Sequence, residues 1–179
     1  YLKNGEVLKG LIKIPTPTIP ITPISLGKSK LKFKKDKKSK SKKFDQTQVD
    51  KVYFGTSNPN LGYFEYIPIT RKKMLLFKLI MNGKVKLYTR TLKVPENYNF
   101  DQSGVMNYSK MDTIEQYYII RENEIVATKV LYNADLRSFI NNIKKYLSDC
   151  ENIVSYIEND IYEEFDITQI IEDYNIICE

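Results

Sequence analysis

The chain has 179 residues, which is enough for one domain with an ordinary hydrophobic core and too few for two independent domains. It contains no histidine and two cysteines, so histidine-based catalysis and His/Cys zinc sites are excluded in their usual forms. The formal charge of +6 hides a division: residues 28–43 hold ten lysines and one aspartate, whereas residues 149–179 hold ten acids and no Lys or Arg. The two ends of the chain therefore carry opposite charge.

The N-terminal segment shows β patterns interrupted by prolines. Asn4-Gly5 predicts a tight turn between Tyr1-Leu2 and Val7-Leu8. Four prolines between residues 15 and 23 favour an extended path along a sheet edge, with docking of a proline-recognising partner as the alternative. We therefore expect the chain to begin with β structure.

Residues 27–44 are predicted to form the lysine-rich tip of a hairpin. Leu31 and Phe33 alternate with lysines, as in a half-buried strand, and Phe44 and Val52 mark the return. The candidate contacts for an anionic partner are Lys34, Lys35, Lys37, Lys38, Lys40, Lys42 and Lys43. Lysine lacks the bidentate geometry with which arginine binds bases and phosphates, which disfavours nucleic acid. An anionic membrane or glycolipid surface, an acidic protein, and a solvated tip without a partner are the alternatives.

The middle of the chain carries the clearest strand signals. Residues 63–69 predict a strand, and residues 73–94 predict a hairpin that turns at Asn82-Gly83. Residues 96–113 are polar and contain glycine, so they predict a loop. Residues 117–130 predict a last hairpin.

After residue 131 the apolar period changes from two to about 3.6 residues. Asn133 is the predicted cap of a helix whose apolar stripe is Leu136, Phe139, Ile140, Ile143 and Leu147. A short helical turn is expected at residues 153–157, and Asp166 with Gln169 predicts the start of a last helix, which contributes Ile170 and Ile171 to the packing. The predicted fold class is α+β: a curved antiparallel sheet or partial barrel of six to nine strands over residues 1–132, covered by two or three helices from residues 133–179.

The sequence contains no recognisable catalytic set, and we expect a protein without enzymatic activity, metal or cofactor. Gly27–Ser29 resembles the end of a phosphate-binding loop, but Thr22 stands where that loop requires glycine. The tail acids form a solvated helix face more often than an acid/base pair, with a glycan-cleaving enzyme as the alternative. The candidate acidic contact face is Glu163, Glu164, Glu172 and Asp173.

Three features concern the compartment. Cys150 and Cys178 predict one disulfide, if the compartment is oxidising, that ties the last helix to the end of the first. Thr113 lies in a short Asp-Thr-apolar pattern that accepts O-glycans in Bacteroidetes-type bacteria, and Asn107–Ser109 matches the N-glycan sequon; both lie in the predicted loop. No run approaches the ~18 apolar residues that a membrane-spanning helix requires.

Four motifs occur together in the second half of the chain: Gly83–Tyr88, Tyr117-Tyr118, Tyr146–Cys150 and Tyr162–Asn175. In these motifs the chain resembles a group of small exported proteins of Bacteroidetes-type bacteria. The resemblance implies a periplasmic or outer-membrane-associated protein, exported through a cleaved signal, with no activity to carry over. We therefore expect an accessory subunit of an outer-membrane or periplasmic protein complex, with a basic nucleic-acid-binding module as the alternative.

Overall fold

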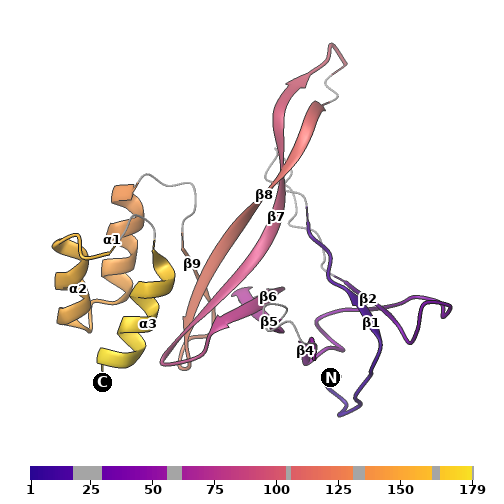
Figure 1. Ribbon diagram of the computed structural model, residues 1–179, viewed down its shortest axis with the longest axis horizontal. Helices are drawn as coiled ribbons and strands as arrows, with labels where there is room; N and C mark the ends of the chain where they lie inside the picture. Colours follow the sequence, from indigo (N-terminus) through magenta and orange to yellow (C-terminus); the bar gives the residue numbers. More distant parts are fainter. Residues whose placement is uncertain (18–29, 56–61, 104–105, 131–135, 163–165, 179) are drawn as a thin grey trace.

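The computed structural model describes residues 1–17, 30–55, 62–103, 106–130, 136–162 and 166–178 (Figure 1). Over these residues the chain is α+β, as predicted: a three-stranded and a six-stranded antiparallel sheet precede three helices. The smaller sheet and the helices lie at opposite ends of the long axis, and a long hairpin rises between them (Figure 1).

The three-stranded sheet confirms the predicted lysine-rich hairpin. Its strands, in spatial order, are β1 (Leu11–Lys13), β2 (Leu31–Lys34) and β3 (Lys42–Phe44). Leu31 of β2 lies opposite Phe44 of β3, so the stem is as expected. The carboxylate of Asp36 closes the turn, because it accepts hydrogen bonds from the backbone N–H groups of Lys38 and Ser39, both at 2.8 Å.

Two local predictions near this sheet need correction. Gly5 has a φ of +86°, which confirms the turn at Asn4-Gly5, and the N–H of Leu2 donates to the carbonyl of Glu6 across it at 2.8 Å. Among the described residues the pairing does not continue to Val7-Leu8, and Leu2 forms a β-bridge with Val49. Val52 belongs to the larger sheet, where it pairs with Phe64, and is not part of the lysine hairpin. Both differences arise because the strand patterns are too short to specify their partners.

The six-stranded sheet is a meander whose strands follow chain order. They are β4 (Lys51–Tyr53), β5 (Tyr63–Thr70), β6 (Lys73–Met81), β7 (Val85–Phe100), β8 (Met106–Arg121) and β9 (Thr128–Val130). The predicted hairpin at Asn82-Gly83 joins β6 to β7. The backbone N–H of Ala127, in the β8–β9 connection, donates to the carbonyl of Pro68 in β5 at 2.8 Å. The sheet is therefore curled, since this bond spans β6 and β7.

Curling gives the sheet an inner and an outer face. The inner face carries one buried cluster: Ile67, Leu75, Phe77, Tyr88, Tyr118 and Ala127. The outer face is covered at its two ends by different elements. Leu31, Val49 and neighbouring residues pack on Tyr66 and Leu76 at one end, and the helices pack on the β7–β9 end.

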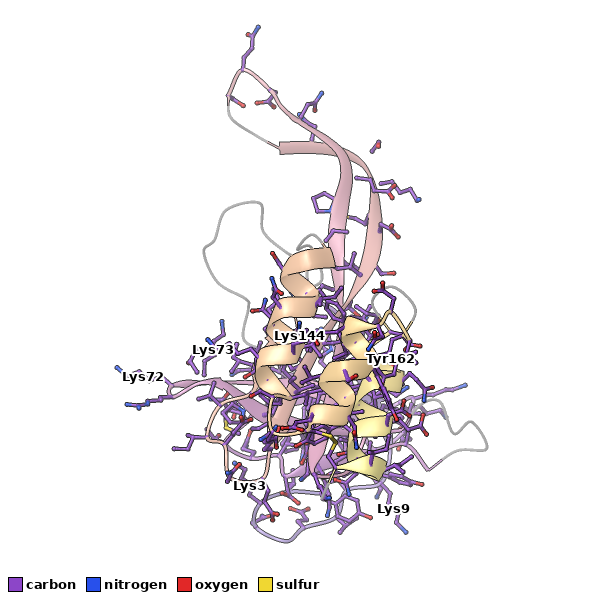
Figure 2. The ribbon with its side chains drawn as sticks, turned by 90° about the vertical axis from the view of Figure 1, so that its left-hand side faces the viewer. Lys3, Lys9, Lys72, Lys73, Lys144 and Tyr162 are labelled. Atoms are coloured by element: carbon purple, nitrogen blue, oxygen red, sulfur yellow. A yellow bond between two sulfur atoms is a disulfide. The ribbon has the colours of Figure 1, made fainter. Side chains whose placement is uncertain are left out.

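The helices form a cap on the outer face of β7, β8 and β9. They are α1 (Leu136–Tyr146), α2 (Glu151–Glu158) and α3 (Ile167–Ile177), and they lie beside the sheet in Figures 1 and 2. Buried residues of the predicted stripes, including Phe139, Ile143 and Ile171, pack against Val85 and Ile119. The predicted cap of α3 is confirmed, because Asp166 accepts a hydrogen bond from the N–H of Gln169 at 3.1 Å. Asn133 lies outside the described residues.

The predicted disulfide is also confirmed. Cys150 and Cys178 are bonded, with 5.7 Å between their Cα atoms. Cys150 directly precedes α2 and Cys178 directly follows α3, so the bond joins the start of α2 to the end of α3. Both cysteines are buried.

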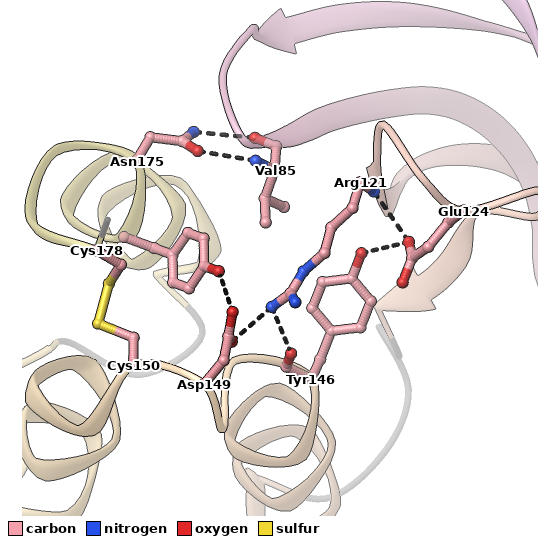
Figure 3. Close-up of polar contacts among 9 residues, drawn as sticks. Val85, Arg121, Glu124, Tyr146, Asp149, Cys150, Asn175 and Cys178 are labelled. Carbon is pink, nitrogen blue, oxygen red and sulfur yellow. Dashed lines mark hydrogen bonds and ion pairs between the residues drawn. A yellow bond between two sulfur atoms is a disulfide. The ribbon is translucent and has the colours of Figure 1, made fainter.

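Polar side chains attach the cap to the sheet (Figure 3). Arg121, at the end of β8, donates to the carbonyl of Tyr146 at 2.9 Å and forms an ion pair with Asp149 at 2.6 Å. The Asp149 carboxylate also accepts the hydroxyl of Tyr174 at 2.7 Å. Burial alone would raise the pKa of Asp149, but the hydrogen bonds from Arg121 and Tyr174 outweigh it and lower that pKa below 3.8. The carboxylate is therefore held ionised as part of a structural joint.

A second attachment joins α3 to β7 through the two hydrogen bonds that a neighbouring strand would form. The Asn175 amide accepts a hydrogen bond from the N–H of Val85 and donates one to the carbonyl of Val85, both at 2.9 Å (Figure 3). The chain approaches closely here, since a Cβ atom on Gly83 would lie 2.5 Å from the Asn175 amide. A side chain at position 83 would therefore collide with the amide that holds α3, so the docking of α3 favours glycine there.

The main error of the sequence prediction concerns residues 96–113. Residues 96–100 and 106–113 form the outer parts of β7 and β8, which pair from Val85–Arg121 to Phe100–Met106, where a loop was predicted. The reason is that a two-stranded ribbon outside the core buries neither face, so it needs no alternation of apolar and polar residues.

Candidate interaction surfaces

The outer part of this hairpin, residues 93–113, is named the β-arm here. Pairing of β7 with β6 ends at Thr89, and pairing of β8 with β9 ends at Tyr117. Within the part of the chain that the structure describes, the β-arm is therefore a ribbon of two strands without a strand on either side. Figures 1 and 2 show it extending away from the body. Such a ribbon is marginally stable in water by itself.

The two edges of the β-arm differ in their hydrogen-bonding groups. The N–H of Lys93 in β7 points outward, since it donates to the carbonyl of Pro17 at 2.9 Å. Backbone direction alternates along a strand, so Pro95 also faces outward, where it supplies no N–H. The β7 edge is thus partly closed by Pro17 and Pro95.

The β8 edge presents a longer row of outward groups. Thr113 lies opposite Lys93, and opposed residues of an antiparallel pair either bond each other or both point away, so the odd-numbered residues of β8 point outward as Lys93 does. The same row continues through residues 109–115, beyond the end of β9. The N–H of Thr113 is bonded locally by the Asp112 carboxylate at 2.8 Å, which is a common way of shielding an exposed edge. This edge is the better template for an added strand.

The proposed glycan sites lie on the β-arm and not in a loop. Asn107, Ser109 and Thr113 are exposed residues of β8. Their accessibility agrees with the sequence prediction, but their extended backbone corrects the local structure expected for them.

A groove lined by lysines lies on the three-stranded sheet. It encloses about 570 Å³ between the N-terminal segment and the lysine hairpin. Its lining residues are Val7, Leu8, Lys9, Phe33, Lys35, Ser39, Lys40 and Lys42. Val7 is 49% exposed although it is apolar, so the groove combines an exposed hydrophobic side chain with four cationic side chains.

The charges of these lysines are not neutralised by their own hairpin. Hydrogen bonds from Ser39 and Lys38 lower the pKa of Asp36, whose carboxylate is occupied by the turn. Asp45 pairs with Lys30 at 3.7 Å, outside the groove. Among the described ion pairs, none contains a lysine of the groove. The groove is therefore an electropositive surface.

The structure divides the seven predicted lysines into two groups. Lys35, Lys40 and Lys42 line the groove, whereas Lys34, Lys37, Lys38 and Lys43 do not. Lys9 was missed by the sequence analysis. It joins the groove because β1 pairs with β2 in antiparallel fashion, and no local pattern in the sequence specifies that pairing.

Two of the four residues of the predicted acidic face belong to the part of the chain that the structure describes. Glu163 and Glu164 lie outside the described residues, Glu172 is exposed, and Asp173 accepts the side-chain N–H of Gln169 at 2.8 Å. Over the described ranges, no group of three or more His, Cys, Asp or Glu residues is placed to hold a metal ion. The same ranges contain no helix of the length and apolarity needed to cross a membrane.

Comparisons with protein families, with curated proteins and with solved structures found no match. The features of this chain that bear on function are therefore the β-arm, the lysine groove and the chemistry of individual side chains.

Proposed function

We propose that this protein is a non-enzymatic accessory subunit that binds a partner protein through the β-arm, in the periplasm or at the outer membrane. The observation that carries the proposal is the ribbon itself: two strands continue beyond the sheet, and the β8 edge is unpaired over residues 109–115 among the described elements. Adding a partner strand to that edge would satisfy its backbone groups and stabilise the ribbon. The disulfide supports an oxidising compartment.

Shortening the β-arm tests the proposal directly. Val94 and Asp112 face each other and point inward, so residues 95–111 can be replaced by Asn-Gly with preserved strand register. The shortened protein should keep its thermal stability, because the β-arm contributes little to the buried core, and should lose a partner that co-purifies under mild detergent. Equal recovery of that partner with the shortened and the full-length chain would refute the proposal.

Cross-linking locates the contact more finely. A photo-crosslinking side chain at Met111, on the β-arm, should capture the partner, whereas one at Lys72 should not. Lys72 is exposed on the β5–β6 turn and projects from the body well away from the β-arm (Figure 2). Substituting Met111 by proline should weaken binding by removing an outward N–H, and substituting it by leucine should not. Similar capture from both positions would argue against the β-arm.

A second function is favoured by the lysine groove: attachment to an anionic lipid or glycolipid surface. Four lysines around the exposed Val7 and the half-buried Leu8 suit a ligand with an anionic head and an apolar body. Vesicles with anionic lipid should bind the protein, with affinity falling steeply as salt rises, and zwitterionic vesicles should not.

The chain offers a charge-matched control for this experiment. Replacing Lys35, Lys40 and Lys42 by glutamine should abolish vesicle binding, whereas replacing Lys37, Lys38 and Lys43 should reduce it modestly, although the net charge changes equally. Equal losses would mean that the groove has no special role. The same titration with single-stranded DNA tests the nucleic-acid alternative, for which binding stronger than that to anionic vesicles would be required.

A further inference from the structure

Arg90 occupies an unusual position for a charged residue. It lies on β7 between Tyr88 and Leu92, on the inner face of the curled sheet, and is 6% exposed. Its cross-strand neighbour on β8 is Gln116, which is also buried. Tyr88 and Leu92 are 2% and 0% exposed, so the guanidinium stands in an interior environment.

The end of the Arg90 side chain has no acceptor. Both terminal nitrogens, Nη1 and Nη2, are sealed from solvent and make no hydrogen bond. The guanidinium carbon lies 5.9 Å from the centre of the Phe77 ring, at the limit of a cation–π contact. Burial lowers the pKa of Arg90, and the Tyr118 phenol opposes that shift, so Tyr118 is close enough for its charge state to affect Arg90. No described ion pair involves Arg90.

Arg121 provides a comparison within the same molecule. Its guanidinium is also partly buried beside two tyrosine rings, but it is neutralised by Asp149 and bonded to the carbonyl of Tyr146. Arg121 is thus neutralised by a carboxylate, although its Nε is buried without a hydrogen bond. Arg90 lacks an equivalent partner among the described residues.

An unpaired interior cation destabilises a protein, and an apolar side chain of similar size generally fits such a place better. Arginine also retains its proton under ordinary conditions, so deprotonation cannot remove the charge. A compensating anion in the functional state accounts for an arginine here.

We propose that Arg90 anchors a binding site for the carboxylate of an apolar small molecule on the inner face of the sheet. A single guanidinium carries one charge and two parallel N–H donors, which match one carboxylate better than a phosphate dianion. The Tyr118 hydroxyl is a second donor, and Phe77, Leu75 and Ile67 belong to the cluster that would meet the apolar body. Because the nitrogens are sealed, entry requires local opening, and association should be slow.

The test uses the full, disulfide-bonded chain and four probes. Decanoate should raise the melting temperature, by about 5–10 °C at a hundredfold excess over its Kd. Decanol, which lacks the charge, should not, and acetate, which lacks the apolar body, should bind at least tenfold more weakly. Decyl phosphate distinguishes a carboxylate site from a general anion site. The assay is calorimetric binding together with thermal unfolding.

Two variants keep the test decisive. Arg90→Met should fold with equal or greater stability and lose the response to decanoate; Arg90→Lys, which keeps the charge but not the planar donors, should bind decanoate at least tenfold more weakly. An unchanged response in both variants would overturn the proposal. So would stabilisation by decyl phosphate exceeding that by decanoate, or the absence of any response in the wild-type protein together with a more stable Arg90→Met variant.

Discussion

Replacing Asn175 by alanine is expected to weaken the attachment of the helical cap to the sheet. The Asn175 amide forms hydrogen bonds with both the N–H and the carbonyl of Val85, a residue that is 0% exposed. Each group left without a partner costs about 1–3 kcal/mol, but Asn175 itself is half-buried and water can replace part of the loss. We therefore expect the free energy of unfolding to fall by about 2–4 kcal/mol.

Urea denaturation followed by circular dichroism measures this change. With a slope of roughly 2 kcal/mol per molar urea, the midpoint should fall by about 1–2 M while the slope stays constant. Glu172→Ala is the matched control, because Glu172 is exposed on the same helix, and it should change stability by less than about 0.5 kcal/mol. A loss from Asn175→Ala as small as that of the control would refute the idea that the amide holds α3 on β7.

Three further changes test neighbouring parts of the structure. Gly83→Ala should lower the free energy of unfolding about as much as Asn175→Ala does, because its Cβ would displace the same amide. In a chain that already carries Asn175→Ala, it should lower that free energy little further, and additive losses would contradict this. Reducing Cys150–Cys178, separated by 28 positions, should lower stability by about 3–4 kcal/mol in the chain-entropy treatment, measured as a urea midpoint with and without reductant. Because the folded pKa of Asp149 lies below the unfolded value of 3.8, its contribution is present above that pH and lost as pH falls through the folded pKa. The free energy of unfolding of Asp149→Asn should therefore fall less steeply as the pH is lowered into the acid range. An unchanged dependence on pH in that range would contradict the role given to Asp149.

The features predicted correctly from the sequence are those encoded by nearby residues. The Asn82-Gly83 turn, the stripe containing Phe139 and Ile143, and the Asp166 cap each depend on residues within a few positions of one another. The disulfide joins residues that are far apart in the sequence, but two cysteines allow only one intramolecular pairing. Local chemistry was therefore sufficient for these elements.

The β-arm could not be predicted by the same reasoning. Strand prediction relies on one face being buried, and residues such as Lys93, Lys110 and Asp112 are exposed on a ribbon that covers nothing. Its pairing is specified instead by continuation of the β7–β8 register from the buried sheet. A long hairpin can thus extend through polar sequence once its base is fixed.

Arg90 shows a different limit. In the sequence of β7, Val85 and Leu87 alternate with Lys86 and Tyr88, a pattern typical of a strand with one buried face. The structure buries both faces of the strand at Tyr88, because the sheet curls inward over one side while the helices cover the other. Sequence alternation indicates which residues share a face, and tertiary contacts decide whether that face meets water. The sequence signal for the site was a lone arginine between Tyr88 and Leu92.

The separation of the charged ends allows the two proposed modes of binding to be distinguished by kinetics. The lysine groove and the helices lie at opposite ends of the long axis, and the described ion pairs near each end, Lys30–Asp45 and Lys144–Glu158, remain local. Screening over about 8 Å at physiological salt prevents the two ends from neutralising each other. The groove should therefore steer an anionic partner, so that glutamine substitutions there reduce the association rate mainly at low salt. Backbone pairing at the β8 edge acts after contact is made, so Met111→Pro should instead increase the dissociation rate at every salt concentration.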